Sequence, residues 1–211
     1  MIARSPAILL LAPALVLWAG ASSLSAETKR IPMADGFDFP VGKPDAEGYY
    51  KARGFWPNGH LGEDWNDKRG GNSDLGAPVY SIGKGIVVQA HDVKVGWGNV
   101  VIVRHIYRDR KTGKLRLIDS LYGHLNEIKV KKGAILQRGQ LLGTIGTNRG
   151  MYAAHLHFEI RKNIYVGMHR SSYKKDFSVY HDPTPFIRAN RKLRNEFRRY
   201  PVPVNTFKPY P

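Results

Sequence analysis

The residues best suited to metal chemistry are a histidine and an aspartate four positions apart, in the run His60-Leu-Gly-Glu-Asp64. With Gly62 between them, a turn or an irregular loop can bring both side chains to one point. Zinc accepts both imidazole nitrogen and carboxylate oxygen as ligands. Histidine and aspartate are also ordinary loop residues, so this run by itself does not establish a metal site.

A second candidate is the run His-Leu-His-Phe-Glu that starts at His155. Successive side chains of a β-strand point to opposite faces, so His155, His157 and Glu159 share one face and the apolar residues between them share the other. We therefore predict that the apolar face packs on the core while both imidazoles face a cleft. The alternative is an amphipathic strand with two surface histidines.

A third candidate is Tyr122-Gly-His124, at the end of an alternating run in which Tyr122 and His124 are predicted to share a face. A lone histidine at a strand end is more often a hydrogen-bonded structural residue than a catalytic one. The weight of the argument lies in the combination of the three runs.

A catalytic zinc site needs three protein ligands and one open position. His60, Asp64 and one member of the His155/His157 pair supply that number, and the residues alone do not say which member. The remaining histidine, together with His124, would be available to act on the reacting groups.

The elements that must position these residues are predicted to be short strands, because β-type runs punctuated by glycine extend from residue 78 to residue 160. The candidate strands are Pro78–Ile82, Gly85–His91, Asn99–Tyr107, Leu115–Leu125 and His155–Ile160. The predicted fold class is mainly β, a compact antiparallel barrel or sandwich with short strands and long loops that rim the cleft. A C-terminal helix is predicted over Thr184–Tyr200, with Thr184 as its cap and Pro185 at its first position.

The chain is predicted to begin with a signal peptide over residues 1–26, because Arg4 precedes an apolar run from Ile8 to Trp18 and small residues up to Ala26. That run is short for a membrane span, so we expect a mature chain without a transmembrane segment, periplasmic or secreted; retention as an N-terminal anchor is the alternative. Without cysteine there is neither a disulfide nor a lipidation site. We divide the rest into an extended lead-in (27–51), a catalytic domain (52–182) and a basic C-terminal helix and tail (183–211).

The formal net charge is +16, and residues 1–26 contribute only Arg4, so the remainder carries +15. This excess favours an anionic polymer or surface as a partner. No nucleic-acid-binding motif is visible, so specific nucleic-acid binding is not expected. The anions that a secreted protein meets first include cell-wall polymers and lipid head groups, and charge alone does not choose between them. Nothing in the pattern indicates an oligomeric state.

Read in chain order, five short motifs resemble those of the LytM/lysostaphin-type zinc endopeptidases, which cleave peptide bonds of bacterial peptidoglycan. The motifs are His60-x-Gly-x-Asp64, Gly76-Ala-Pro-Val-Tyr80, Gly96-Trp-Gly-Asn-Val-Val-Ile102, Tyr122-Gly-His-Leu125 and His155-Leu-His-Phe-Glu159. The resemblance implies one zinc ion (Zn2+) per chain, held by His60, Asp64 and His157. It also implies that His124 and His155 are the catalytic histidines.

Three further residues are candidates for contacting a metal ligand or the substrate: His105, Tyr122 and Glu159. Trp97, between two glycines, is interpreted as a packing or turn residue. No His-Glu-x-x-His run is present, so a histidine rather than a glutamate must take the proton from water.

Three stretches depart from the family pattern, namely 65–75, 108–120 and Ala153-Ala154. Because loops rim the cleft, we expect them to affect substrate preference rather than the ligands. The rival function is an inactive relative that binds cell-wall peptide or activates another hydrolase.

Overall fold

The computed structural model describes residues 27–57, 59–169 and 177–208, so the expected signal peptide lies outside the described residues. The strands are β1 (Thr28–Pro32), β2 (Tyr49–Arg53), β3 (Glu63–Asp67), β4 (Pro78–Tyr80), β5 (Gly85–Asp92), β6 (Asn99–Arg108), β7 (Leu115–Ile128), β8 (Ile135–Leu136), β9 (Leu141–Ile145), β10 (Leu156–Arg161), β11 (Tyr180–His181) and β12 (Arg199–Pro203). The helical elements are α1 (Pro183–Ala189) and the short turns Gly42–Ala46, Val95–Trp97 and Phe177–Val179. No helix within these described ranges is long and apolar enough to cross a membrane.

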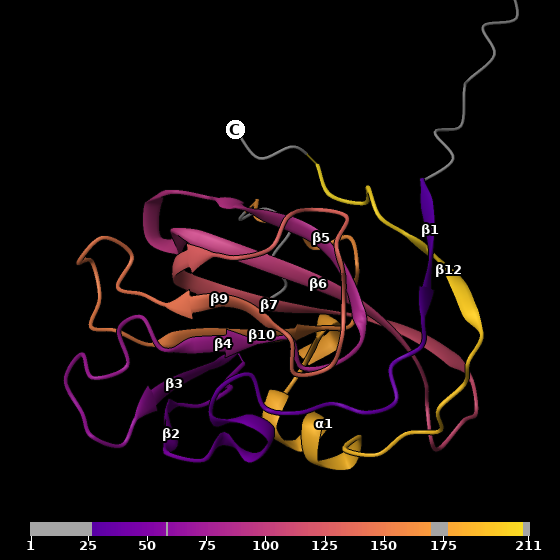
Figure 1. Cartoon of the computed structure of the whole chain (residues 1–211), viewed down its shortest axis with the longest axis horizontal. Coiled ribbons are helices and arrows are strands. Elements are labelled where there is room, and N and C mark those ends of the chain that lie inside the picture. The colour runs from indigo at the N-terminus through magenta and orange to yellow at the C-terminus, as the bar shows by residue number, and fades with distance from the viewer. Residues whose placement is uncertain (1–26, 58, 170–176, 209–211) are drawn as a thin grey trace, which may run out of the picture.

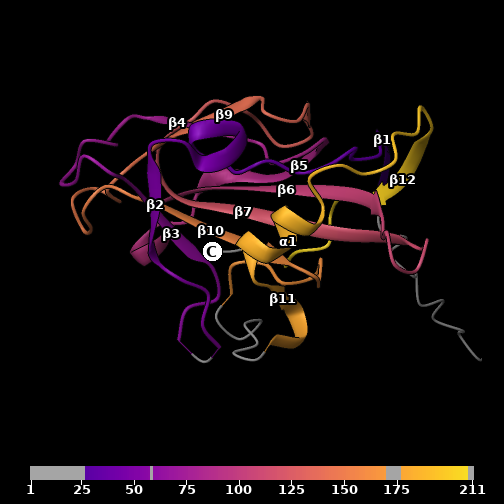
Figure 2. The ribbon, with the colours of Figure 1, turned by 90° about the horizontal axis from the view of Figure 1, so that it is seen from below.

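Ten of the described strands form one large antiparallel sheet with the order β2-β3-β10-β7-β6-β5-β8 (Figure 1). In the same sheet β11 pairs with β10, and β9 pairs with both β7 and β4. The long β6–β7 hairpin forms its centre, and Figure 2 shows α1 beside the β7–β10 part of the sheet. The prediction of a mainly β, antiparallel fold is therefore confirmed.

Both faces of the central strands are buried. Val101 and Val103 of β6 point into the larger apolar cluster, while Val100 and Ile102 point into a second one on the other face. Residues along β6 therefore alternate between two buried clusters, because chain segments from both ends cover the second face.

Those covering segments are the expected lead-in and tail. Strand β1 pairs antiparallel with β12, with Ile31 opposite Tyr200, to form a separate two-stranded sheet. Ile31 and Val202 are fully buried in the second cluster. The end of the chain therefore contains a strand where a tail was expected. Its few apolar residues are too widely spaced among prolines and charges to show a period.

A helix lies where the C-terminal helix was predicted, but its N-cap is Asp182 and not Thr184, and it ends eleven residues before the predicted end at Tyr200. Helix α1 buries Phe186 and Ile187 and ends at Ala189. Beyond it the chain runs extended against the N-terminal segment, since the Arg191 guanidinium donates to Asp38 Oδ1 at 2.7 Å. Phe197, which falls within the predicted helix range, is 99% exposed.

Candidate metal centre

The candidate metal ligands come from neighbouring elements. Asp64 lies on β3 directly opposite His157 on β10, and His60 lies in the turn just before β3. This arrangement requires Gly62, because a Cβ atom there would lie 2.3 Å from the carbonyl oxygen of Phe158 on β10. The glycine lets the turn approach β10 closely enough for His60 to reach the same point as the two strand residues.

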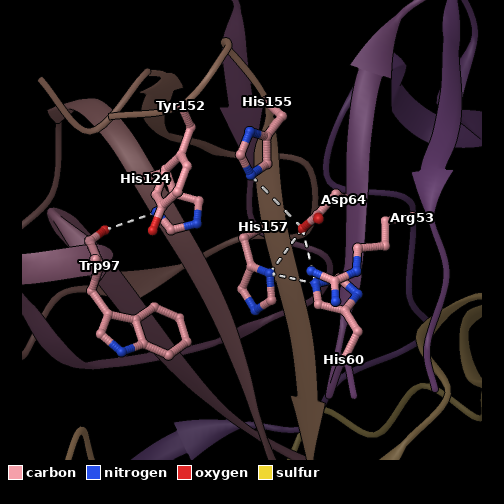
Figure 3. A pocket seen from close by; sticks show the side chains of 9 residues that line it. Arg53, His60, Asp64, Trp97, His124, Tyr152, His155 and His157 are labelled. Carbon is pink, nitrogen blue, oxygen red and sulfur yellow. Dashed lines mark hydrogen bonds and ion pairs between the residues drawn. The ribbon is translucent and has the colours of Figure 1, made fainter. Parts of the chain in front are cut away.

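Three ligand atoms converge there (Figure 3). His60 Nε2 lies 3.1 Å from His157 Nδ1, and Asp64 Oδ1 lies 3.1 Å and 2.9 Å from these two nitrogens. Ligand atoms around a tetrahedral zinc are about 3.3 Å apart, as follows from bonds of roughly 2.0–2.1 Å. Within the described part of the chain, His60, Asp64 and His157 form a group whose ligand atoms lie close enough together to hold one metal ion.

The outer nitrogens of both imidazoles are already occupied. His60 Nδ1 lies 3.0 Å from the carbonyl oxygen of Gly54, and His157 Nε2 lies 3.0 Å from Glu159 Oε1. If these nitrogens carry the ring protons, His60 Nε2 and His157 Nδ1 present lone pairs to the common point beside a carboxylate. Such a donor set fits a zinc ion.

The charges around the centre also suit a cation. Burial opposes ionisation of Asp64, but hydrogen bonds from His157 and His60 outweigh it and lower its pKa. Burial likewise opposes ionisation of Glu159, whose pKa neighbouring Arg161 and His157 lower to about 2. Against the effect of burial, Asp64 and Glu159 raise the pKa of His157 to about 9. The two carboxylates on either side of His157 therefore favour positive charge at this buried position, which a bound cation would supply.

His124 and His155 stand across the pocket from the ligands. The pocket has a volume of about 270 Å³ and is lined by Arg53, His60, Asp64, Gly96, Trp97, His124, Tyr152, His155 and His157. The ring of His124 lies 4.9 Å from that of His155, and His155 Nε2 lies 3.9 Å from Asp64 Oδ1. Both members of the His155/His157 pair thus face the pocket, as predicted, although β10 itself begins only at Leu156.

His124 reaches the pocket through an irregularity in β7. Its φ is +60°, a left-handed conformation that a non-glycine residue rarely adopts, and the β6–β7 register shifts beside it. By strict alternation Gly123, which lies opposite His157, would share the pocket face, and His124 would point with Tyr122 into the core. The prediction that Tyr122 and His124 share a face is therefore wrong, because the bulge redirects the histidine.

Two of the predicted candidates lie away from the pocket. His105 is fully buried, with Nε2 2.8 Å from Ser120 Oγ and Nδ1 2.9 Å from the carbonyl oxygen of Lys84. The Ser120 hydroxyl donates to the hydroxyl of Tyr122, which also accepts from the backbone N–H of Ile82. His105 and Tyr122 thus belong to a buried hydrogen-bond network in the core. Glu159, by contrast, lies beside His157 as expected.

Besides Gly96, three pocket residues were not predicted as site residues. Trp97 stacks on His124 with ring centroids 6.1 Å apart and meets the edge of His157 at 5.3 Å, so it forms one wall rather than only a turn. Tyr152 packs against His124 at 4.8 Å. Arg53, on β2, flanks the ligands (Figure 3). Tyr152 could have been predicted as a pocket residue from its place in the loop just before His155. No local sequence pattern identifies Arg53 as a pocket residue.

Comparisons with known proteins identify the family to which the chain is similar. A family profile described as "Peptidase family M23" matches residues 60–169. The chain is 38% identical over 90 residues to the peptidoglycan DD-endopeptidase ShyB of Vibrio cholerae, which covers 41% of this chain and 18% of that protein. It is 29% identical over 113 residues to the murein hydrolase activator NlpD of Salmonella typhimurium, covering 50% of this chain and 27% of that protein.

The solved catalytic domain of lysostaphin from Staphylococcus simulans is 28% identical, covers 66% of this chain and 92% of that domain, and superposes with a TM-score of 0.48. The matches to the first curated relatives span about a fifth of the length of those proteins. The resemblance stated from the motifs is confirmed at the level of the family.

Proposed function

The chain belongs to Peptidase family M23, and from this premise we propose that it is a secreted zinc endopeptidase that hydrolyses peptide cross-links or bridges of bacterial peptidoglycan. The observation that carries the proposal is the convergence of His60, Asp64 and His157 on one point, facing two further histidines across a pocket. The name of ShyB, a peptidoglycan DD-endopeptidase, supports the substrate class.

In this proposal His60 Nε2, Asp64 Oδ1 and His157 Nδ1 hold the zinc ion. When bound there, zinc supplies a Lewis acid that polarises a carbonyl and makes water acidic, with a pKa of about 7. Glu159 fixes the orientation and tautomer of His157 from behind. The donor set is the one that a catalytic zinc site with one open position requires.

His124 and His155 are proposed to move the proton. Burial, reinforced by the neighbouring His157 and His155, lowers the pKa of His124 to about 3, so its ring is neutral at neutral pH. With Nδ1 3.1 Å from the carbonyl oxygen of Trp97, Nε2 is the nitrogen left to act in the pocket. His155 is oriented in the same way, by the carbonyl oxygen of Ala153 at 2.8 Å from its Nδ1.

The test compares two histidine variants for zinc content and for clearing of isolated cell walls. His157→Ala should lose both the zinc and the hydrolysis. His124→Ala should retain one zinc per chain and lose turnover. Full hydrolysis by metal-stripped His157→Ala would overturn the proposal.

A second candidate function is activation of another cell-wall hydrolase without catalysis, which the name of NlpD favours. Against it, all three proposed ligands and both flanking histidines are present here and face one pocket. Adding a second hydrolase to the cell-wall assay separates the two functions. If the protein is an activator, its His124→Ala variant should stimulate that hydrolase as well as wild type does. If the protein is a peptidase, the same variant should fail to clear walls.

We further propose that the protein acts outside the cytoplasm, on the pattern of residues 1–26, and binds an anionic wall polymer through a basic end. Strands β6 and β7 meet there in a hairpin, which Figures 1 and 2 both place beside β12, away from β2 and β3. An ion pair of 2.8 Å between Arg108 and Glu196 joins the hairpin to the segment before β12. The length of β6 separates this end from the pocket by about 30 Å.

The exposed cations of this basic end make no ion pair within the described residues. They are Arg110, Lys111, Lys114, Arg116, Arg194 and Arg198. Changing Lys111, Lys114 and Arg116 together to glutamate should weaken wall binding at low salt and leave hydrolysis of a short soluble peptide unchanged. Unchanged wall binding would exclude this surface. Deleting the tail would be a poorer test, because it removes β12 and the buried Val202.

A further inference from the structure

The loop between β3 and β4 reaches back to the residue that precedes His155. This loop and Ala153-Ala154 are two of the stretches that depart from the family pattern, and the structure brings them together. Asn66 Nδ2 donates to the carbonyl oxygen of Ala154 at 3.0 Å, and the N–H of Ala154 donates to Asn72 Oδ1 at 2.8 Å. Both backbone polar groups of Ala154 are therefore bonded to asparagine side chains, one near the end of β3 and one in the loop that follows it.

Ala154 depends on these side chains because it lies outside the strand ladder. Strand β10 begins at Leu156, and the nearest backbone bond, from the N–H of His155 to the carbonyl oxygen of Gly146, is long at 3.3 Å. Ala154 is nevertheless fully buried. A buried backbone group without a partner is strongly unfavourable, so the two asparagines hold the chain at this point.

The loop is itself held in shape around Asn72. The Arg69 guanidinium forms a bidentate ion pair with Asp67 and also donates to the carbonyl oxygen of Ser73 at 3.1 Å. The N–H of Leu75 donates to the carbonyl oxygen of Asn72 at 3.0 Å, which closes a turn. The acceptor on Asn72 is thus presented by a braced loop rather than by a free side chain.

The connection to chemistry runs through the backbone. Ala154 is bonded covalently to His155, whose ring is oriented by the carbonyl oxygen of Ala153. A shift of the Ala154 peptide would move the His155 ring relative to Asp64, from which its Nε2 is 3.9 Å away. An error of about 1 Å in the placement of a catalytic group can reduce a rate about 100-fold.

We propose that Asn66 and Asn72 are positioning residues that hold His155 in place by clamping the backbone N–H and C=O groups of Ala154. The inference rests on the proposed function, in which His155 acts in the reaction. It gives the unusual β3–β4 loop a role on the catalytic side of the pocket. The two asparagines differ in what they supply, since Asn72 must accept and Asn66 must donate.

That difference makes Asn→Asp substitution a discriminating test. Aspartate keeps the acceptor, so Asn72→Asp should retain kcat within about twofold, whereas Asn72→Ala should lose about 10- to 100-fold. Asn66→Asp removes the donor and should be as impaired as Asn66→Ala. In the impaired variants KM and the zinc content should remain unchanged. Lys68→Ala, an exposed position of the same loop, is the control and should behave as wild type.

Hydrogen exchange of the Ala154 amide supplies a readout that does not need activity. The amide should be protected in wild type and Asn72→Asp and lose protection in Asn72→Ala. If wild type itself fails to hydrolyse cell walls, the proposed function fails, while the exchange pattern still decides whether the clamp exists. The clamp is overturned if both alanine variants keep kcat and amide protection, or if the two aspartate variants are impaired equally.

Discussion

Removal of the Glu159 carboxylate should lower both the affinity of the site for zinc and the stability of the fold, and the two effects can be measured separately. Glu159 lies between His157 and Arg161, with its two oxygens 3.0 Å from His157 Nε2 and 2.7 Å from Arg161 Nε. It is 3% exposed, and Arg161 is fully buried. Glu159→Ala therefore removes a partner from a metal ligand and from a buried cation at the same time.

The size of each effect follows from these contacts. Removing one member of a buried ion pair costs about 3–5 kcal/mol, because the other charge stays buried. For a domain of this size that corresponds to a decrease in Tm of about 6–20 °C. Loss of the group that orients a metal-binding histidine typically reduces metal affinity about 10- to 100-fold.

Asp119→Ala is the matched control. Asp119 pairs with Arg104 through two bonds of 2.7 Å, and both residues are 0% exposed. Neither contacts the pocket. Arg104 retains other acceptors, such as the carbonyl oxygen of Ile164, just as Arg161 retains that of Val166. This variant should lose a similar amount of stability and none of its zinc affinity.

The assay is competition for zinc with a chromophoric chelator, combined with thermal unfolding of the zinc-free proteins. The reasoning predicts that both variants melt lower and that only Glu159→Ala binds zinc more weakly. If the two variants bind zinc equally tightly, Glu159 does not orient His157 for metal binding. Its contact with the imidazole then contributes only to the stability of the fold.

Two further predictions concern a glycine and a core histidine. Gly62→Ala places a Cβ atom 2.3 Å from the Phe158 carbonyl oxygen, so it should lower the free energy of unfolding, measured with denaturant, by about 1–3 kcal/mol and weaken zinc binding. Gly54→Ala has open space around the added Cβ atom and should change neither quantity. Equal behaviour of the two variants would refute the close approach at Gly62. Burial lowers the pKa of His105 to about 4, below its usual value near 6.5, so the unfolded chain takes up a proton first as the pH falls. Stability from this residue is complete above pH 6.5 and falls by about 3 kcal/mol toward pH 4. His105→Gln should lack this part of the acid destabilisation, and parallel stability curves for the two proteins would contradict it.

The strand interior of the fold could be predicted from local patterns, and the contributions of the two chain ends could not. Short apolar, β-branched runs such as Val100–Val103 favour strands and glycine marks the turns, so the mainly β class follows directly. The pairing of β1 with β12 joins residues such as Thr28 and Pro203 that lie at opposite ends of the chain. Single apolar residues such as Ile31 and Val202 carry no period, so this long-range pairing leaves no local signal.

The ligand set shows the same division between local pattern and long-range pairing. The spacing of His60 and Asp64 and the period of His155 and His157 identified four of the five proposed chemical residues. Which histidine joins Asp64 depends on the β3–β10 register, where His157 and not His155 lies opposite it. Register is a property of two strands 93 positions apart, so only the family resemblance could anticipate it.

His124 shows why a period can place a catalytic side chain on the wrong face. The alternation along β7 is real as far as Tyr122, which is buried opposite Phe158 as a period of two requires. One extra residue at the bulge then reverses the face, and the cost is a left-handed backbone at a histidine. Such strain persists only where surrounding contacts enforce it, here the carbonyl oxygen of Trp97 on the ring of His124. The bulge that makes the period-of-two prediction wrong is thus the feature that places the His124 side chain in the pocket. We therefore take the strained φ at this position as independent support for the proposed role of His124 in the reaction.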